Sequence, residues 1–183
     1  MDDEQAIRRL KNGDIGGLEL LVARYQVKAV RIASFITDDQ ALAEEVVQET
    51  FVRLHRRIRQ FDVTRPFEPY FLRSVVNAAL NAARQEKRSL SLDGDLAAVE
   101  TMLDQAPPVE AQVEFGQMKG EITRALSRLS PRQRAVIIQR YYLEMSEQEM
   151  SQTLGIAPGT IKWLLNAARE RLRSLLGSGR SAS

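Results

Sequence analysis

Residues 146–172 read SEQEMSQTLGIAPGTIKWLLNAARERL, and their polar, apolar and turn residues follow the order of a helix-turn-helix. Ser146, with a glutamate three residues later, forms a capping box that opens a short helix. Gly155 tolerates a positive φ and Pro158 cannot extend the preceding helix, so a tight turn must come next. A longer helix is expected from Thr160 to about residue 176. Its core stripe recurs at helical spacing and comprises Ile161, Leu165, Ala168, Leu172 and Leu175.

The longer helix also carries a polar row that is predicted to face solvent. In a helix-turn-helix the second helix enters the major groove, where asparagine pairs with adenine and lysine or arginine meets guanine or phosphate. Trp163 has a second interpretation, packing against Leu143 or Met145, and that interpretation is favoured. An ordinary antiparallel helix pair would show the same caps and stripe, so the motif is not conclusive alone. The candidate contacts with duplex DNA are Thr160, Lys162, Trp163, Asn166, Arg169 and Arg173.

The segments before this motif also carry helix signals. A helix is expected from Ser130 to about Tyr142, because serine caps a helix, proline suits its first position and a glutamine completes the capping box. Apolar residues at helical spacing predict a helix over 18–36 and another over 40–59. The second of these is expected to begin at Thr37-Asp38-Asp39-Gln40, with the glutamine placed for a capping box.

Two prolines interrupt the helical pattern over 62–69, which predicts a loop there and a further helix over 70–88. A polar row at steps of three and four residues runs along that helix and contains no acid. Solvated helix faces usually mix acids with bases, so an acid-free row favours contact with nucleic acid. The row comprises Arg73, Asn77, Asn81, Arg84 and Arg88.

Charge divides the chain into blocks. Residues 89–118 hold six acids and no lysine or arginine, with glycine and proline interspersed, whereas residues 119–183 hold eleven bases and five acids. These blocks predict an all-α protein of two small helical domains joined by a flexible acidic linker. The N-terminal domain is expected over 1–88 and the helix-turn-helix domain over 119–176, with a disordered tail at 177–183.

Composition excludes most enzyme classes. The chain has no cysteine and one histidine, His55, so it lacks a thiol nucleophile and a two-histidine metal site. It also lacks a phosphate-binding glycine loop and a convincing carboxylate pair, so we expect no catalytic residue, metal or cofactor. No apolar run approaches the ~20 residues of a membrane span, and the acidic residues 1–5 lack the features of a secretory signal. A cytoplasmic location without membrane insertion follows as an expectation.

Two segments resemble a known family. Residues 43–51, AEEVVQETF, followed by Phe61-Asp62, resemble the core-binding segment of bacterial sigma factors of the extracytoplasmic-function (ECF) group. Residues 126–134, LSRLSPRQR, and 155–162, GIAPGTIK, resemble the C-terminal domain of the same group, in the expected order. The resemblance covers nearly the whole chain except the linker and the termini. The sequence departs from the family's pattern after Lys162, where fewer cations follow.

The resemblance implies a sigma factor that directs bacterial RNA polymerase core to specific promoters and assists their melting. In the family, the helix bearing residues 43–51 docks on the polymerase, which assigns Glu45, Gln48 and Glu49 to that interface. The proline loop and the next helix capture the melted promoter strand in the family. Phe67 could equally be a core residue. The residues assigned to this role are Arg65, Phe67, Arg73, Asn77, Asn81, Arg84 and Arg88.

The family resemblance also implies an anti-sigma partner, besides polymerase core and promoter DNA in duplex and melted form. Two alternatives stay open at this point. A helix-turn-helix regulator that never touches polymerase would explain 119–183 but not the segment at 43–51. An interaction protein that mimics a sigma factor and titrates its regulator would leave DNA unbound. Salt dependence separates these alternatives, because a DNA-binding protein loses affinity steeply as salt rises.

Overall fold

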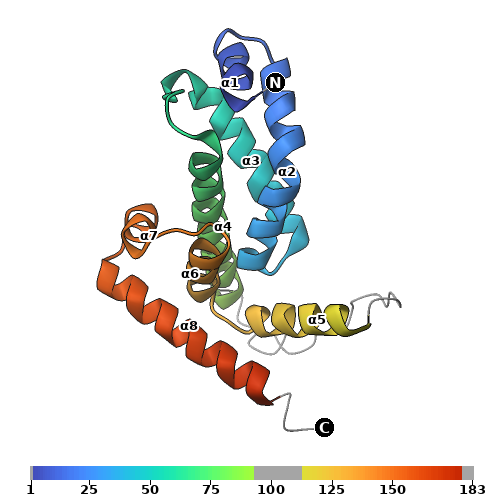
Figure 1. Cartoon of the computed structure of the whole chain (residues 1–183), viewed down its shortest axis with the longest axis vertical. Coiled ribbons are helices and arrows are strands. Elements are labelled where there is room, and N and C mark those ends of the chain that lie inside the picture. The colour runs from blue at the N-terminus through green and yellow to red at the C-terminus, as the bar shows by residue number, and fades with distance from the viewer. Residues whose placement is uncertain (1, 93–112, 179–183) are drawn as a thin grey trace.

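A computed structural model of the protein describes residues 2–92 and 113–178, which contain helices and no strand (Figure 1). The all-α fold predicted from the sequence is therefore confirmed. The first group of helices is α1 (Asp3–Lys11), α2 (Gly16–Thr37), α3 (Gln40–Arg57), the 3-10 turn η1 (Ile58–Gln60) and α4 (Phe67–Leu92). The second group is α5 (Val113–Ser127), α6 (Pro131–Tyr141), α7 (Glu147–Leu154) and α8 (Pro158–Ser178).

Local capping explains where most helices begin. Ser130 and Ser146 cap α6 and α7, each in a complete capping box, and Gly155 ends α7 with a left-handed φ of 64°, as predicted. The start of α3 differs from the prediction. Asp39 alone caps it, accepting from the Leu42 amide at 2.8 Å, while the Gln40 side chain donates to Glu44 instead of completing a capping box.

Other boundaries differ by a few residues. Helix α4 begins at Phe67 rather than at Tyr70, because Pro69 lies in the first turn, where its missing amide hydrogen is not needed. Helix α8 begins at Pro158 for the same reason and continues to Ser178. Helix α5 begins at Val113, inside the predicted linker. Residues 93–112 of that linker and residues 179–183 of the predicted tail lie outside the described residues.

The core of the first group of helices is aromatic. Helices α2, α3 and α4 pack together, with α1 across one end of α2 (Figure 1). Phe71 lies at the centre, 4.5 Å from Phe51 and 5.6 Å from Phe67 between ring centroids. Tyr25 and Phe61 complete the cluster. These rings pack with the buried aliphatic residues of the same helices, and their burial contributes strongly to the core of this domain.

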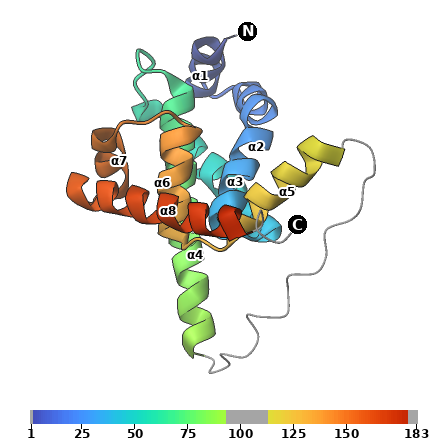
Figure 2. The same cartoon turned by 60° about the horizontal axis from the view of Figure 1, so that its bottom comes forward.

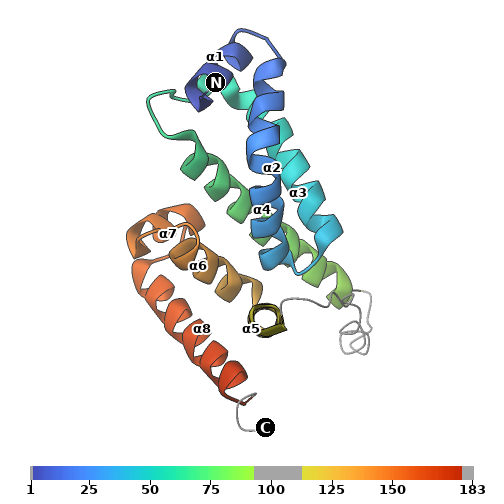
Figure 3. The same cartoon turned by 45° about the vertical axis from the view of Figure 1, so that its right-hand side comes forward.

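The second group of helices has its own core, in which α6, α7 and α8 meet. Val136, Met150, Ile161 and Ala168 are fully buried there, consistent with the stripe predicted for α8. The two groups also touch, because α6 packs against α2 and α4 (Figure 3). Figure 2 shows α8 lying across α6 on the side away from the α2–α4 bundle.

Candidate nucleic-acid interface

Helix α8 presents its predicted DNA-binding row to solvent. Thr160, Lys162, Asn166 and Arg173 are exposed, while Arg169 is partly covered. Trp163 is 65% exposed, so the expectation that it packs against neighbouring apolar residues is wrong. The indole is available to contact a partner, because the core positions of α8 are already occupied by its apolar stripe.

A contact from α6 orients Arg169. The Arg169 Nε donates to the Tyr141 hydroxyl at 2.8 Å, and the guanidinium lies 5.7 Å from the centroid of the same ring. Tyr141 is itself 59% exposed. Sequence reasoning missed this tyrosine, because it lies 28 residues before Arg169 and outside the helix-turn-helix.

A groove of about 240 Å³ runs between α3 and α4. It brings Asn77 and Asn81, both predicted from α4, next to Arg53 and Arg57 from α3, with Tyr70 also lining it. Sequence reasoning missed the two arginines. Only their one-turn spacing on α3 could have indicated a common face.

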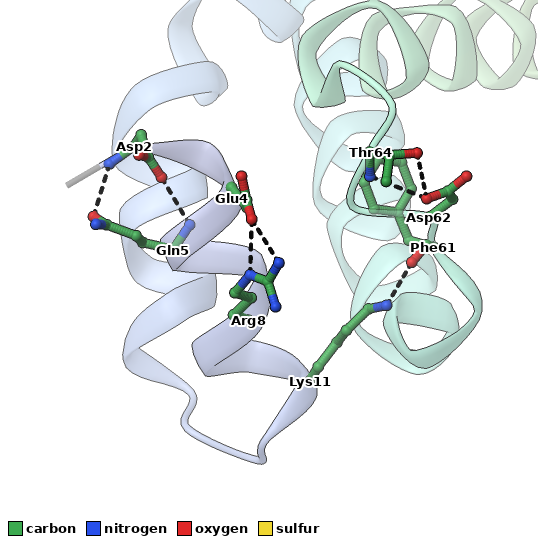
Figure 4. Close-up of polar contacts among 8 residues, drawn as sticks. All are labelled: Asp2, Glu4, Gln5, Arg8, Lys11, Phe61, Asp62 and Thr64. Atoms are coloured by element: carbon green, nitrogen blue, oxygen red, sulfur yellow. Dashed lines mark hydrogen bonds and ion pairs between the residues drawn. The ribbon is translucent and has the colours of Figure 1, made fainter.

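The loop that leads into α4 is fixed by polar contacts (Figure 4). The Lys11 ammonium donates to the Phe61 carbonyl at 2.5 Å, and the Asp62 carboxylate accepts from the Thr64 hydroxyl at 2.7 Å and the Thr64 amide at 3.0 Å. These Thr64 bonds hold the pKa of Asp62 below its ordinary value. Arg65 follows in the same loop, exposed and 3.6 Å from Asp62.

The remaining predicted strand-binding residues differ in their surroundings. Phe67 is 2% exposed and packs among the core rings, so it is a core residue and cannot reach DNA in this arrangement. Arg84 is exposed on α4, whereas the side chain of Arg88 lies outside the described part of the chain. Arg73 forms an ion pair with Glu149 of α7, with its Nη2 at 2.6 Å from the carboxylate. Hydrogen bonds from Ser146 chiefly, and Arg73 secondarily, lower the pKa of Glu149.

A second and larger groove, of about 950 Å³, lies between α2 and α3. It is mainly apolar, and its lining includes Val22, Val27, Val30, Phe51 and Val52. Val27 is 71% exposed and Val52 is 42% exposed, so this groove leaves neighbouring apolar side chains of two helices uncovered. Nothing in the sequence singles out Val27, because a helix-periodic pattern does not show which apolar face is left uncovered.

The predicted polymerase-binding residues all lie on α3, and Gln48 lines the α2–α3 groove. Glu45 and Glu49 are exposed but do not line it, and Glu49 is 3.8 Å from Arg53. The acid on the lining is Glu44, which was not predicted. Within residues 2–92 and 113–178, acids and histidine form no cluster suited to a metal ion. No helix among the described residues is long and apolar enough to cross a membrane.

Comparison with known proteins identifies both halves of the chain. Residues 21–89 match the family described as Sigma-70 region 2, and residues 119–172 match Sigma-70 region 4. The SigW ECF sigma factor of Bacillus subtilis is 28% identical over 180 residues, covering 94% of this chain and 96% of the relative. The SigL ECF sigma factor of Mycobacterium tuberculosis is 32% identical over 149 residues, covering 80% and 81%.

Two solved structures share the fold. The sigma factor RpoE from Bartonella quintana, determined with the anti-sigma factor NepR, aligns with a TM-score of 0.66 at 22% identity, covering 87% of this chain and 96% of that one. CnrH, determined with the cytosolic domain of CnrY, aligns with a TM-score of 0.61 at 22% identity, covering 96% and 97%.

Region 2 and region 4 in this order define the class of bacterial transcription initiation factors. Within that class, the chain belongs to the ECF RNA polymerase sigma factors. Its function is therefore to direct the polymerase core to specific promoters and to assist their melting. Sigma factors are regulatory proteins, and the polymerase supplies the chemistry. A helix-turn-helix regulator acting without polymerase does not account for the match over residues 21–89.

Proposed function

We propose that the groove between α3 and α4 holds the melted promoter strand. The observation that carries this proposal is the convergence of Arg53 and Arg57 on Asn77 and Asn81, with the half-exposed ring of Tyr70 beside them. Proteins that bind single strands combine cations that follow the phosphates with aromatic rings on which bases stack. Asparagine amides add donors and acceptors for the edges of unstacked bases.

The strand-binding proposal can be tested with matched arginine variants. Arg57→Ala should weaken binding of a single-stranded promoter oligonucleotide about tenfold, since one charge-assisted hydrogen bond contributes roughly 1.5 kcal/mol. Arg56→Ala removes the same charge from a neighbouring exposed residue that does not line the groove, so it should change affinity less than about twofold. Fluorescence anisotropy measures both. Equal losses would indicate general electrostatic attraction and contradict the proposal.

Asn77 of the groove and Arg84, further along α4, provide a second test. Asn77→Ala and Arg84→Ala should weaken promoter opening more than polymerase binding, because both residues lie on α4, away from the α2–α3 groove. Opening is followed by permanganate reactivity of unpaired thymines, and polymerase binding by co-elution. Equal loss of opening and of polymerase binding would indicate a folding defect instead.

We propose that α8 contacts the distal, duplex promoter element. The exposed side chains of Lys162, Trp163 and Asn166 support this, because they precede Arg169 and Arg173 along one helix. Asn166→Ala should relax base preference at one position, as expected for a contact with a base edge. Arg173→Ala should lower affinity for all sequences and reduce the salt slope by about one, as expected for a phosphate contact.

The α2–α3 groove is our proposed site for the polymerase core. An apolar groove with Gln48 on its lining and Glu45 and Glu49 on the same helix suits a protein partner better than DNA, since acids repel phosphate. Val27→Asp should abolish co-elution with the core polymerase without changing the far-ultraviolet circular dichroism. Ile15→Asp introduces the same charge at another exposed apolar residue, where aspartate is a favourable helix cap, and should co-elute normally.

We also propose that the protein lies in the cytoplasm and is bound there by an anti-sigma partner. RpoE, which shares this fold, was determined with the anti-sigma factor NepR, and CnrH with the cytosolic domain of CnrY. The uncovered apolar groove of this chain is a surface on which such a partner could compete with polymerase. Purification from the native host, followed by displacement of any bound protein with excess polymerase core, tests the competition.

A further inference from the structure

The helix-turn-helix domain packs against the other domain through one face of α6. Ala135 and Ile138 of α6 are buried in the same cluster as the aromatic core of α2, α3 and α4. Helices α2 and α4 both contact α6, and α4 also contacts α7 (Figure 3). The apolar contact is therefore continuous with the core of the N-terminal domain.

Polar contacts surround this apolar patch and link the same two domains. Arg73 of α4 pairs with Glu149 of α7 at 2.6 Å, and the Arg134 Nη1 of α6 lies 3.2 Å from the Asp38 carboxylate. The Lys28 ammonium of α2 lies 5.5 Å from the centroid of the Tyr142 ring. Each contact joins a residue before the linker to a residue after it.

The same interface buries polar atoms that have no protein partner. Gln139 is 0% exposed, and neither its amide nitrogen nor its amide oxygen has a hydrogen-bond partner. The Nε atoms of Arg73 and Arg134 are also buried without one. Gln139 lies one helical turn after Ala135, so it shares the face of α6 that meets the N-terminal domain. Such groups regain hydration when the surfaces separate, so their burial makes closure of the two domains less favourable.

We infer that α6 and α7 form a docking surface for the N-terminal domain of the same chain, and that Glu149 withholds Arg73 from the promoter strand while the domains are closed. This inference rests on the proposed strand-binding role of α4 and extends it to Arg73, which lies one helical turn before the groove residue Asn77 but does not itself line the groove. Glu149 supplies a carboxylate where the strand would supply a phosphate, so Arg73 has one anionic partner at a time. Opening of the contact releases both Arg73 and the surface of the helix-turn-helix that carries Glu149.

Glu149→Gln removes the ion pair with Arg73 and keeps the fold of α7. Glutamine is accepted at the same position of a capping box, so the cap of α7 by Ser146 is preserved. Glu147→Gln is the matched control, because it removes an exposed carboxylate from the first turn of the same helix. A partly exposed pair contributes little, so Glu149→Gln should shift the ratio of closed to open protein by roughly two- to fivefold.

The composition of the chain provides the readout. Trp163 is its one tryptophan and it has no cysteine, so an acceptor dye on Gln85→Cys, at an exposed residue of α4, reports the separation of the domains by energy transfer. In the full chain, Glu149→Gln should lower energy transfer and raise single-strand affinity by up to the same two- to fivefold factor as the shift in the ratio of closed to open protein, because apparent affinity scales with the competent fraction. Glu147→Gln should change neither.

Each outcome separates the docking contact from the strand-binding proposal. If energy transfer is the same in Glu149→Gln and Glu147→Gln, the docking inference is overturned, whether or not their affinities for the single strand differ. Transfer that falls without a gain in strand affinity overturns the role of Arg73 in strand binding and supports the docking contact. Salt provides a second perturbation that needs no substitution at Glu149. Raising salt from about 0.1 to 1 M should lower energy transfer more in the otherwise unsubstituted protein than in Glu149→Gln, because both proteins keep the Arg134–Asp38 pair but only the former also has the Arg73–Glu149 pair to screen.

Discussion

Replacing Gly17 with alanine should lower the free energy of unfolding by about 2 kcal/mol, because α1 lies directly against the backbone of α2 at this residue. An ideal Cβ at Gly17 would lie 2.3 Å from the Ala6 carbonyl oxygen and 2.8 Å from the Leu10 amide nitrogen. Ordinary contacts need about 3.5 Å, so the backbone of α1 must move by about 1 Å. Overpacking costs roughly 1–3 kcal/mol, and the higher helix propensity of alanine offsets at most about 1 kcal/mol.

Gly16→Ala is the matched control for this substitution. The nearest atom to its added Cβ is the Arg9 Nη2 at 2.8 Å, the end of a flexible side chain that can move aside. We therefore expect a change within about 0.5 kcal/mol, as for an ordinary surface substitution. Urea denaturation followed by circular dichroism gives both values from the midpoints, provided that the slope is unchanged. Equal midpoints for the two variants would refute the close approach of α1 to α2.

Three further predictions follow from side-chain contacts. Burial first, and a hydrogen bond to Asp3 second, raise the pKa of Tyr25, so its contribution to stability is complete below its ordinary pKa of about 10 and is lost as pH rises beyond it. Above pH 10 the urea midpoint should therefore fall further in the native protein than in Tyr25→Phe, and parallel decreases would contradict this. Phe71 is 1% exposed, so Phe71→Ala should lower the free energy of unfolding by about 3–5 kcal/mol, and Phe71→Leu by distinctly less. Calorimetry measures both, and equal losses would contradict tight packing around the ring. Tyr141→Phe keeps the ring but removes the hydroxyl that accepts from Arg169, so duplex affinity should fall about two- to fivefold by anisotropy; unchanged affinity would show that the hydroxyl does not position the arginine for DNA.

Helix starts were predicted well where their signals are local. The caps at Ser130 and Ser146 and the turn at Gly155 depend on residues within one helical turn, and the structure confirms all three. The start of α4 was predicted three residues too late, since a proline in the first turn was interpreted as a helix breaker. Helix α1 was not predicted, although Asp2 and Gln5 form a capping box at its start.

The sequence predicted candidate site residues within single helices, but not which residues of a neighbouring helix lie beside them. Spacing along α4 identified the row that includes Asn77 and Asn81, but not the arginines that α3 places beside them. Phe67 was predicted either to contact DNA or to be a core residue, and the packing between helices buries it in the core. Trp163 was expected to pack, yet the stripe of α8 leaves it in solvent.

The amino-acid sequence by itself determined the helix-turn-helix, the acid-free row on α4 and the resemblance to ECF sigma factors, because caps, turns and helical periodicity act over a few residues. Only the tertiary structure decided that Tyr141 meets Arg169 and that Arg73 meets Glu149, across 28 and 76 residues of chain. Such pairs form when the burial of apolar faces brings separate helices together, and that burial is set by the whole core. The closed contact between the two domains depends on the same long-range packing, so the local signals of the sequence did not reveal it.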